Sequence, residues 1–118
     1  MATLSTHLLS SVDGTHAGGV AVSVVEIAAD GSRKTLRDTT TDDGGRFVEE
    51  FDITNTSPET TYEMVVVSSA WFAKQDIPRP GQQIVTDIVI RFAMPDPDAR
   101  YHIPIIIGPN GYSTWWSS

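Results

Sequence analysis

The chain contains no cysteine, which excludes a disulfide framework, a thiol nucleophile and any thiolate metal site. Basic side chains are scarce. The chain has eight Lys and Arg residues against fifteen Asp and Glu residues, which leaves a net charge of −7. Such a charge repels phosphate backbones and anionic lipid surfaces, so we expect neither nucleic acid nor a membrane as a partner. No apolar run approaches the roughly 20 residues of a membrane span, and we expect a soluble protein.

The first residues lack a basic segment followed by an apolar one, so we expect no secretory leader and a cytoplasmic location. The length of 118 residues fits a single domain over residues 1–118 that buries its own core. Metal-ligand spacing is also absent, because none of His7, His16 and His102 lies two or four positions from another. We therefore expect no metal site.

Apolar residues recur with a period of two between closely spaced turn residues, which predicts an all-β sandwich or barrel. The most apolar segment, Tyr62–Ser69, is expected at the centre of its sheet. Lys34–Thr41 and Arg46–Asp52 are expected to be edge or half-exposed strands. Asp30-Gly31 predicts a tight hairpin turn. The predicted strands are Thr3–Leu9, Val20–Ile27, Lys34–Thr41, Arg46–Asp52, Tyr62–Ser69, Ile84–Phe92, His102–Ile107 and Tyr112–Trp116.

One segment departs from the strand pattern. Ser69–Asp76 carries apolar and aromatic residues without alternation, and it predicts about two turns of helix. Pro78 and Pro80 prevent the helix from continuing. We expect this to be the only helix of the chain.

Imidazole titrates near neutral pH, so His7, His16 and His102 are the candidates for acid and base chemistry. His7 and His102 lie in predicted strands, where each ring is either functional or merely satisfies a structural hydrogen bond. We interpret His16, in a glycine-flanked loop, as a solvated loop residue. Arg46 follows a glycine-rich turn, where its guanidinium either binds a planar anionic or carbonyl-rich ligand or forms a surface ion pair.

Three segments carry a family likeness. They are Leu4–Leu9 (LSTHLL), Thr41–Arg46 (TDDGGR) and, most specific, Tyr101–Ile107 (YHIPIII) followed by Gly111–Thr114 (GYST). In this order and spacing they resemble the transthyretin-like 5-hydroxyisourate hydrolase family. The likeness extends over nearly the whole chain.

The resemblance implies a transthyretin-like sandwich of two four-stranded sheets with one short helix, assembled as a homotetramer, a dimer of dimers with its sites in the channel between dimers. Members of the family open the purine ring of the small molecule 5-hydroxyisourate by attack of water at a ring carbonyl, on the path from urate to allantoin. They use no cofactor. His7, Arg46 and His102 match the catalytic positions of the family.

The C-terminus departs from the family, whose members end in Tyr-Arg-Gly-Ser. The resemblance places substrate-binding residues at Ser113, Trp115, Trp116 and Ser118. Trp116 replaces a substrate-contacting arginine of the family, so a large apolar surface takes the place of a permanent charge. In the first loop, His16 replaces an expected proline.

Three functions fit this sequence. The first is a 5-hydroxyisourate hydrolase of purine metabolism whose pocket accommodates Trp116. The second is a family member recruited to another cofactor-independent ring opening, dehydration or cyclisation of a more apolar small molecule in a biosynthetic pathway. The third is a non-catalytic small-molecule carrier, against which the retained His7 and His102 argue.

Overall fold

Burial alternates from residue to residue along β1 (Ala2–Ser10), and this strand organises the fold. Leu4, Thr6 and Leu8 are buried, whereas Ser5 and His7 between them are half-buried. Because successive side chains of a strand point to opposite faces, β1 turns one face to the core and the other outward. The structure is a computed structural model that describes residues 1–76 and 81–117.

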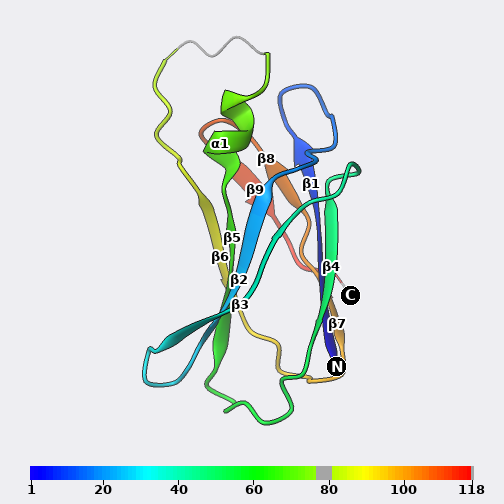
Figure 1. Cartoon of the computed structure of the whole chain (residues 1–118), viewed down its shortest axis with the longest axis vertical. Helices are drawn as coiled ribbons and strands as arrows, with labels where there is room; N and C mark the ends of the chain where they lie inside the picture. The colour runs from blue at the N-terminus through cyan, green and yellow to red at the C-terminus, as the bar shows by residue number, and fades with distance from the viewer. Residues whose placement is uncertain (77–80, 118) are drawn as a thin grey trace.

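Two sheets pack face to face (Figure 1). In the first, β1 pairs with antiparallel β4 on one side and with parallel β7 and β8 on the other, and β9 pairs with β8. In the second, the order is β3, β2, β5 and β6, with every neighbouring pair antiparallel. The bounds are β2 Ala21–Ile27, β3 Arg33–Thr40, β4 Arg46–Phe51, β5 Thr61–Val66, β6 Ile88–Phe92, β7 Arg100–His102, β8 Ile105–Ile107 and β9 Tyr112–Thr114.

The predicted all-β fold class is confirmed, with one change in the strand count. The first sheet has five strands instead of four, because the predicted strand His102–Ile107 is divided between β7 and β8. Pro104 lies in the break, and proline has no amide hydrogen to donate to a strand ladder. Since β7 and β8 both run parallel to β1, the two pieces follow the path of one strand.

The predicted positions of strands within the sheets are also confirmed. β5 lies between β2 and β6, and β3 and β4 are edge strands. The turn at Asp30-Gly31 joins β2 to β3, and Gly31 has a positive φ of 88°. Most strand boundaries agree with the prediction to within one residue. The larger differences are that β5 ends at Val66 rather than Ser69, β6 begins at Ile88 rather than Ile84, β7 begins at Arg100 rather than His102, and β9 ends at Thr114 rather than Trp116.

The short helix α1 spans Ser68–Ala73, against a predicted Ser69–Asp76. Phe72 is fully buried, and Trp71 Nε1 donates a hydrogen bond of 2.9 Å to the carbonyl oxygen of Gly18. Pro78 and Pro80, which the sequence predicts to end the helix, lie outside the described residues. Within residues 1–76 and 81–117, no helix is long and apolar enough to cross a membrane.

The core between the sheets is built from their inward-facing side chains. Each large side chain that is buried contributes about 1.5–3 kcal/mol to folding. A shift of one residue in the pairing of a strand would turn its buried side chains to the solvent. The core therefore also sets the register of the strands. The largest fully buried side chains are Leu4, Leu8, Val20, Val22, Val24, Tyr62, Met64, Val66, Phe72, Ile88, Ile105 and Ile107.

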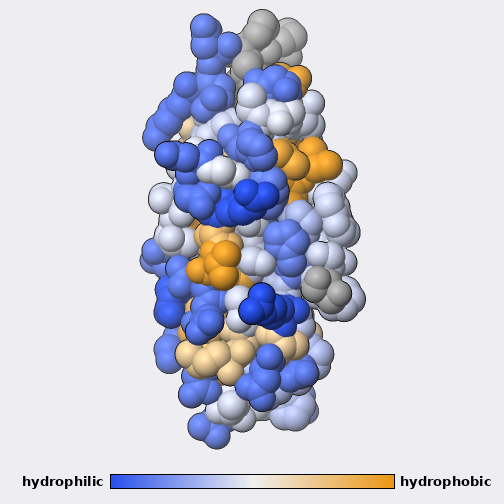
Figure 2. Space-filling view, turned by 90° about the vertical axis from the view of Figure 1, so that its right-hand side faces the viewer, coloured by the Kyte–Doolittle hydropathy of each residue, from blue (hydrophilic) through white to orange (hydrophobic). Residues whose placement is uncertain are grey.

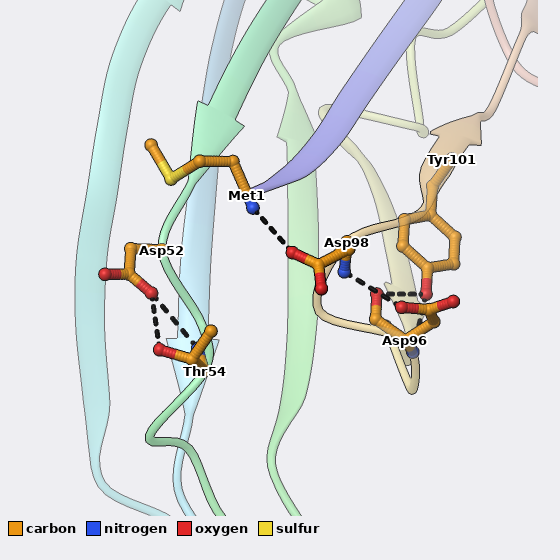
Figure 3. A network of polar contacts seen from close by, with 6 residues as sticks. All are labelled: Met1, Asp52, Thr54, Asp96, Asp98 and Tyr101. Atoms are coloured by element: carbon orange, nitrogen blue, oxygen red, sulfur yellow. Dashed lines mark hydrogen bonds and ion pairs between the residues drawn. The ribbon is translucent and has the colours of Figure 1, made fainter.

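The start of β1 is tied to the connection between β6 and β7 (Figure 3). The amino group of Met1 lies 2.9 Å from Asp98 Oδ1. In the same connection, the Tyr101 hydroxyl donates to the carbonyl of Asp96 and accepts from its amide, both at 2.8 Å. These contacts hold the chain where it crosses from one sheet to the other, and so place β7 with its His102 beside β1.

A tight turn, Asp42–Arg46, leads into β4 and packs against β1. The Asp42 carboxylate accepts hydrogen bonds from the amides of Gly44 and Arg46, at 2.9 and 3.0 Å. Gly45 has a φ of 76°, and a Cβ atom there would lie 2.5 Å from the carbonyl oxygen of Leu8. The backbone of the turn thus approaches β1 at a distance that only glycine permits.

We expect Gly45→Ala to destabilise the protein more than Gly31→Ala does. At both positions alanine would occupy the left-handed region, which costs about 1–2 kcal/mol. A Cβ atom at Gly31 meets nothing within 4 Å, whereas at Gly45 overpacking against Leu8 adds about 1–3 kcal/mol. Denaturant titration measures both free energies of unfolding, and equal losses would contradict the close approach.

Candidate functional site

The outward face of the first sheet contains the polar residues that the sequence singled out. His7 and Arg46 are directly opposite each other in the pairing of β1 with β4. On the other side of β1, Ser5 is paired with His102 of β7. Because Ser5 and His7 are two residues apart on one strand, they share its outward face. The sheet therefore brings His7, Arg46 and His102 together from three separate segments.

The Asp42–Arg46 turn positions Arg46 beside β1. The amide of Leu8 donates a hydrogen bond of 2.7 Å to the carbonyl of Gly45, directly before Arg46. The side chain of Arg46 is exposed. Among the described residues, no carboxylate lies within the 4.0 Å of an ion pair with it. Of the two interpretations of Arg46, this arrangement favours ligand binding over a surface ion pair.

The imidazole of His102 is held by β1. Ser5 Oγ and His102 Nδ1 are 2.8 Å apart, and the tautomer of the ring decides which of them donates. The main chain of His102 also exchanges two hydrogen bonds with Ser117, of 3.1 and 2.8 Å. Sequence reasoning missed Ser5 as a partner of His102. The available signal was its spacing of two residues from His7 on a predicted strand.

His16 is an exposed residue of the loop after β1, as predicted, but it also contacts His7, which the sequence analysis did not predict. The loop after β1 folds back, and His16 forms an antiparallel bridge with Leu9. As a result His7 Nε2 and His16 Nδ1 are 2.7 Å apart, and the two ring planes lie within 16° of parallel with centroids 4.9 Å apart. One sequence carries no signal for this contact, because the course of the loop decides whether the two rings meet.

The surroundings of His7 favour its neutral form. Burial lowers the pKa of His7 most, and the charge of Arg46 lowers it next, followed by His16. A hydrogen bond to the main chain of Gly44 raises the pKa, and His102 lowers it slightly further. The pKa therefore lies below the ordinary value, so His7 keeps a lone pair and can accept a proton near neutral pH.

Two imidazoles and a guanidinium on one face have complementary chemistry. His7 can accept a proton, and His102 can accept or deliver one. Arg46 can donate two parallel hydrogen bonds to a carbonyl oxygen or an anion. Within the part of the chain that the structure describes, no three His, Asp and Glu side chains are arranged to hold a metal ion.

The segment after β9 continues the register of the β8–β9 pair. Ser113 is opposite Ile106, and Ser117 is opposite His102 in the same register. Ser113 and Ser117 therefore share the outward face with His102, and strand alternation places Trp115 between them on that face. Trp115 is 49% exposed. Both Ser113 and Trp115 thus lie on the same side of the sheet as the histidines.

Trp116 lies on the opposite side of this segment. Its indole lines an apolar cavity of about 280 Å³ together with Tyr101 and Ile103, which are buried residues of the first sheet, and with Phe92, Ala93 and Pro95. The structure of the single chain therefore does not bring Trp116 together with His7 and Arg46. Ser118 lies outside the described residues.

The site is an open surface in the single chain. Figure 2 shows this side of the molecule, where apolar areas lie among hydrophilic ones. Val48, which is opposite Ser5 on β4, is 63% exposed. Leu9 and Ile106 are paired with each other on the same face and are half-buried. Exposed apolar side chains beside a polar cluster are typical of surfaces that another chain covers.

The fold and this face define a two-sheet β-sandwich protein that carries imidazole and guanidinium groups on the outer surface of one sheet. The family model for the HIUase/Transthyretin family matches residues 4–116. The chain therefore belongs to the HIUase/Transthyretin family. The match includes His7, Arg46 and His102.

Full-length relatives are named as hydrolases. The 5-hydroxyisourate hydrolase of Caulobacter vibrioides is 30% identical over 121 residues, which cover 100% of both chains. The structure of Klebsiella pneumoniae 5-hydroxyisourate hydrolase is 30% identical with a TM-score of 0.76, and the match covers 100% of both chains. An (S)-allantoin synthase structure has a TM-score of 0.80 at 24% identity, covering 99% of this chain and 44% of that chain, and this likeness concerns the fold alone.

We expect an NMR titration to place the pKa of His7 below that of a free histidine, and Arg46→Gln to raise it. Loss of the guanidinium removes the repulsion that disfavours the imidazolium form. Arg46→Lys keeps the positive charge and should keep the pKa low. Any activity that needs neutral His7 falls as the pH drops through this pKa, so its acid limb should lie at higher pH in Arg46→Gln.

Lys34→Gln on β3 of the other sheet is the control for the change in net charge. It should leave the His7 titration unchanged. A His7 titration that Arg46→Gln and Lys34→Gln affect equally would contradict the local effect of Arg46.

Proposed function

We propose that this chain is a 5-hydroxyisourate hydrolase, which opens the purine ring of its small-molecule substrate in urate degradation. The observation that carries the proposal is the meeting of His7, Arg46 and His102, from three separate segments, on one sheet face. The names of relatives that match along their full length support the same substrate.

Opening a cyclic amide with water needs a base for the water, a donor for the carbonyl oxygen and an acid for the leaving nitrogen. We assign the base to His7, because its lowered pKa keeps it neutral. Arg46, opposite His7, donates to the carbonyl oxygen on which negative charge develops. His102, held by Ser5, delivers a proton to the leaving nitrogen.

The proposed substrate contacts are Ser113, Trp115, Trp116 and Ser118. Trp115 has the best support, because an exposed indole on the face of His102 can stack on a flat heterocycle. Ser113 lies on the same face and provides a hydroxyl group. For Trp116 and Ser118 the support is the family resemblance alone.

We propose a cytoplasmic homotetramer, a dimer of dimers, in which each subunit is a single domain over residues 1–118. The support is the open face, where the proposed catalytic residues lie beside the exposed Val48. A second dimer on this face would exclude water from the reaction. Hydrogen bonds from Arg46 would then be stronger than in an open site, because the local dielectric constant falls.

Freshly generated 5-hydroxyisourate, followed by its ultraviolet absorbance, should decay faster with the wild-type protein than without it. His7→Ala and His102→Ala should each lower the catalysed rate by about 10²- to 10⁴-fold, the usual contribution of a general acid or base. Thr35→Gln, at an exposed position of β3, is the control and should keep the rate.

Two outcomes of this assay would overturn different parts of the proposal. No acceleration by the folded wild-type protein would remove the hydrolase function. Full activity of both His7→Ala and His102→Ala, beside an active wild type, would remove the residue assignment and leave the function.

Light scattering after gel filtration should give a tetramer for the wild type and a smaller species for Val48→Glu. The reason is that a carboxylate at Val48 would lose its hydration where the dimers meet. Thr35→Glu adds the same charge on the other sheet and should remain tetrameric. A wild-type monomer that retains full hydrolase activity would exclude the shared site.

A further inference from the structure

The hydroxyl group of Ser5 is not needed to build the first sheet. The carbonyl of Ser5 already accepts a hydrogen bond of 2.9 Å from the amide of Ile103, which directly follows β7. Beside it, the buried hydroxyl of Thr6 donates to the carbonyl of Ile103 at 2.6 Å. These bonds and the strand pairing fix the backbone of β7 against β1. The Ser5 hydroxyl group therefore acts on the position of the His102 side chain.

The backbone of His102 is held on its other side by the C-terminal segment. Its amide donates to the carbonyl of Ser117 at 3.1 Å, and its carbonyl accepts from the amide of Ser117 at 2.8 Å. With the main chain fixed in this way, the ring can still turn about its two side-chain torsions. The contact of 2.8 Å between Ser5 Oγ and His102 Nδ1 sets that rotation.

The other ring nitrogen of His102, Nε2, is left for the reaction. Within residues 1–76 and 81–117, no side chain or main-chain group forms a hydrogen bond with it. His102 is level with Ser5 in the sheet, and Ser5 and His7 are two residues, or about 7 Å, apart along β1. A bicyclic substrate can bridge such a distance. The ring thus has its partnered nitrogen toward β1 and its other nitrogen available to a ligand that also contacts His7.

The chemistry of an acid fixes the direction of the hydrogen bond between Ser5 and His102. In the protonated ring both nitrogens carry hydrogen and neither has a lone pair, so Ser5 Oγ can only accept from Nδ1–H. When the leaving C–N bond breaks, its electron pair forms an N–H bond with the proton from Nε2. The ring becomes neutral with hydrogen still on Nδ1, and its bond to Ser5 is unchanged. Nε2 then takes up a new proton from the solvent.

We propose that Ser5 is a positioning residue for His102: its hydroxyl oxygen accepts from Nδ1–H in both the protonated and the neutral ring, and so makes Nε2 the nitrogen that exchanges protons with the substrate. The proposal rests on the proposed function, because it concerns His102 as the acid for the leaving nitrogen. A hydroxyl group suits this role, because it accepts the hydrogen bond without the negative charge of a carboxylate, which would hold the proton on the ring.

Three substitutions separate this hydrogen bond from other effects. Ser5→Ala removes the hydroxyl group, whereas Ser5→Thr keeps it on a side chain that suits a strand. Thr3→Val, which also removes a hydroxyl group, is the control, because Thr3 is half-buried on the same face of β1 two residues before Ser5. The main-chain bonds of Ser5 do not involve its side chain, so we expect all three variants to fold.

The first readout is nitrogen NMR of the His102 ring, which needs no substrate. In the wild type, the neutral ring should carry its hydrogen on Nδ1. In Ser5→Ala the tautomer with hydrogen on Nε2 should appear, because Nδ1–H has lost its acceptor. Ser5→Thr and Thr3→Val should keep the wild-type signals. A neutral wild-type ring with hydrogen on Nε2 would mean that Ser5 donates, and it would overturn the proposal without any variant.

The second readout is the kinetics of 5-hydroxyisourate hydrolysis. Ser5→Ala should lower kcat by about ten- to a hundredfold, as expected for a reacting group held out of line, with a smaller change in KM. Ser5→Thr should recover most of kcat, and Thr3→Val should keep it. An unchanged kcat in Ser5→Ala, beside an active wild type, would overturn the positioning role alone. An inactive wild type whose neutral His102 carries hydrogen on Nδ1 would instead overturn the proposed function and leave the hydrogen bond.

Discussion

The register of β1 is the constraint on which the rest of the structure depends. Leu4 and Leu8 are fully buried between the sheets, and His7 is carried on the opposite face of the same strand. A shift of one residue would place His7 in the core and expose the leucines. The burial of these apolar side chains is a large, non-directional driving force. It fixes the register of β1 and, with it, the face of the sheet on which His7 lies.

The site is completed by pairing partners that come from distant parts of the chain. β4 brings Arg46 to one side of His7, and β7 brings His102 to the other side through Ser5. Gly45 allows the turn before β4 to touch the backbone of β1, and Pro104 ends the ladder directly after β7. Small backbone features therefore decide where the charged side chains lie. The sheet holds the backbone of the site, and the Ser5–His102 and His7–His16 contacts join its side chains.

Much of this arrangement could be predicted from residue pattern and family likeness. The apolar segment around Met64 is a central strand, and the threonine-rich β3 is an edge, because burial demands apolar residues on both faces only at the centre. The expected strand from Ile84 was too long. Residues from 84 to 87 are held in part by side-chain contacts from Asn110, whose Oδ1 accepts from the amides of Ile84 and Val85, and not by a neighbouring strand.

By itself, the sequence determined the all-β class, most strand positions and the identity of His7, Arg46 and His102 as candidates, because periodicity and local motifs are properties of neighbouring residues. Only the tertiary structure decided which groups touch. It placed Ser5 against His102, His16 against His7, and Trp116 at the wall of an apolar cavity on the opposite side of its segment from Trp115. These contacts depend on strand register and on the path of a loop, which are set by burial and backbone hydrogen bonding across the whole domain. No local pattern of residues contains that information.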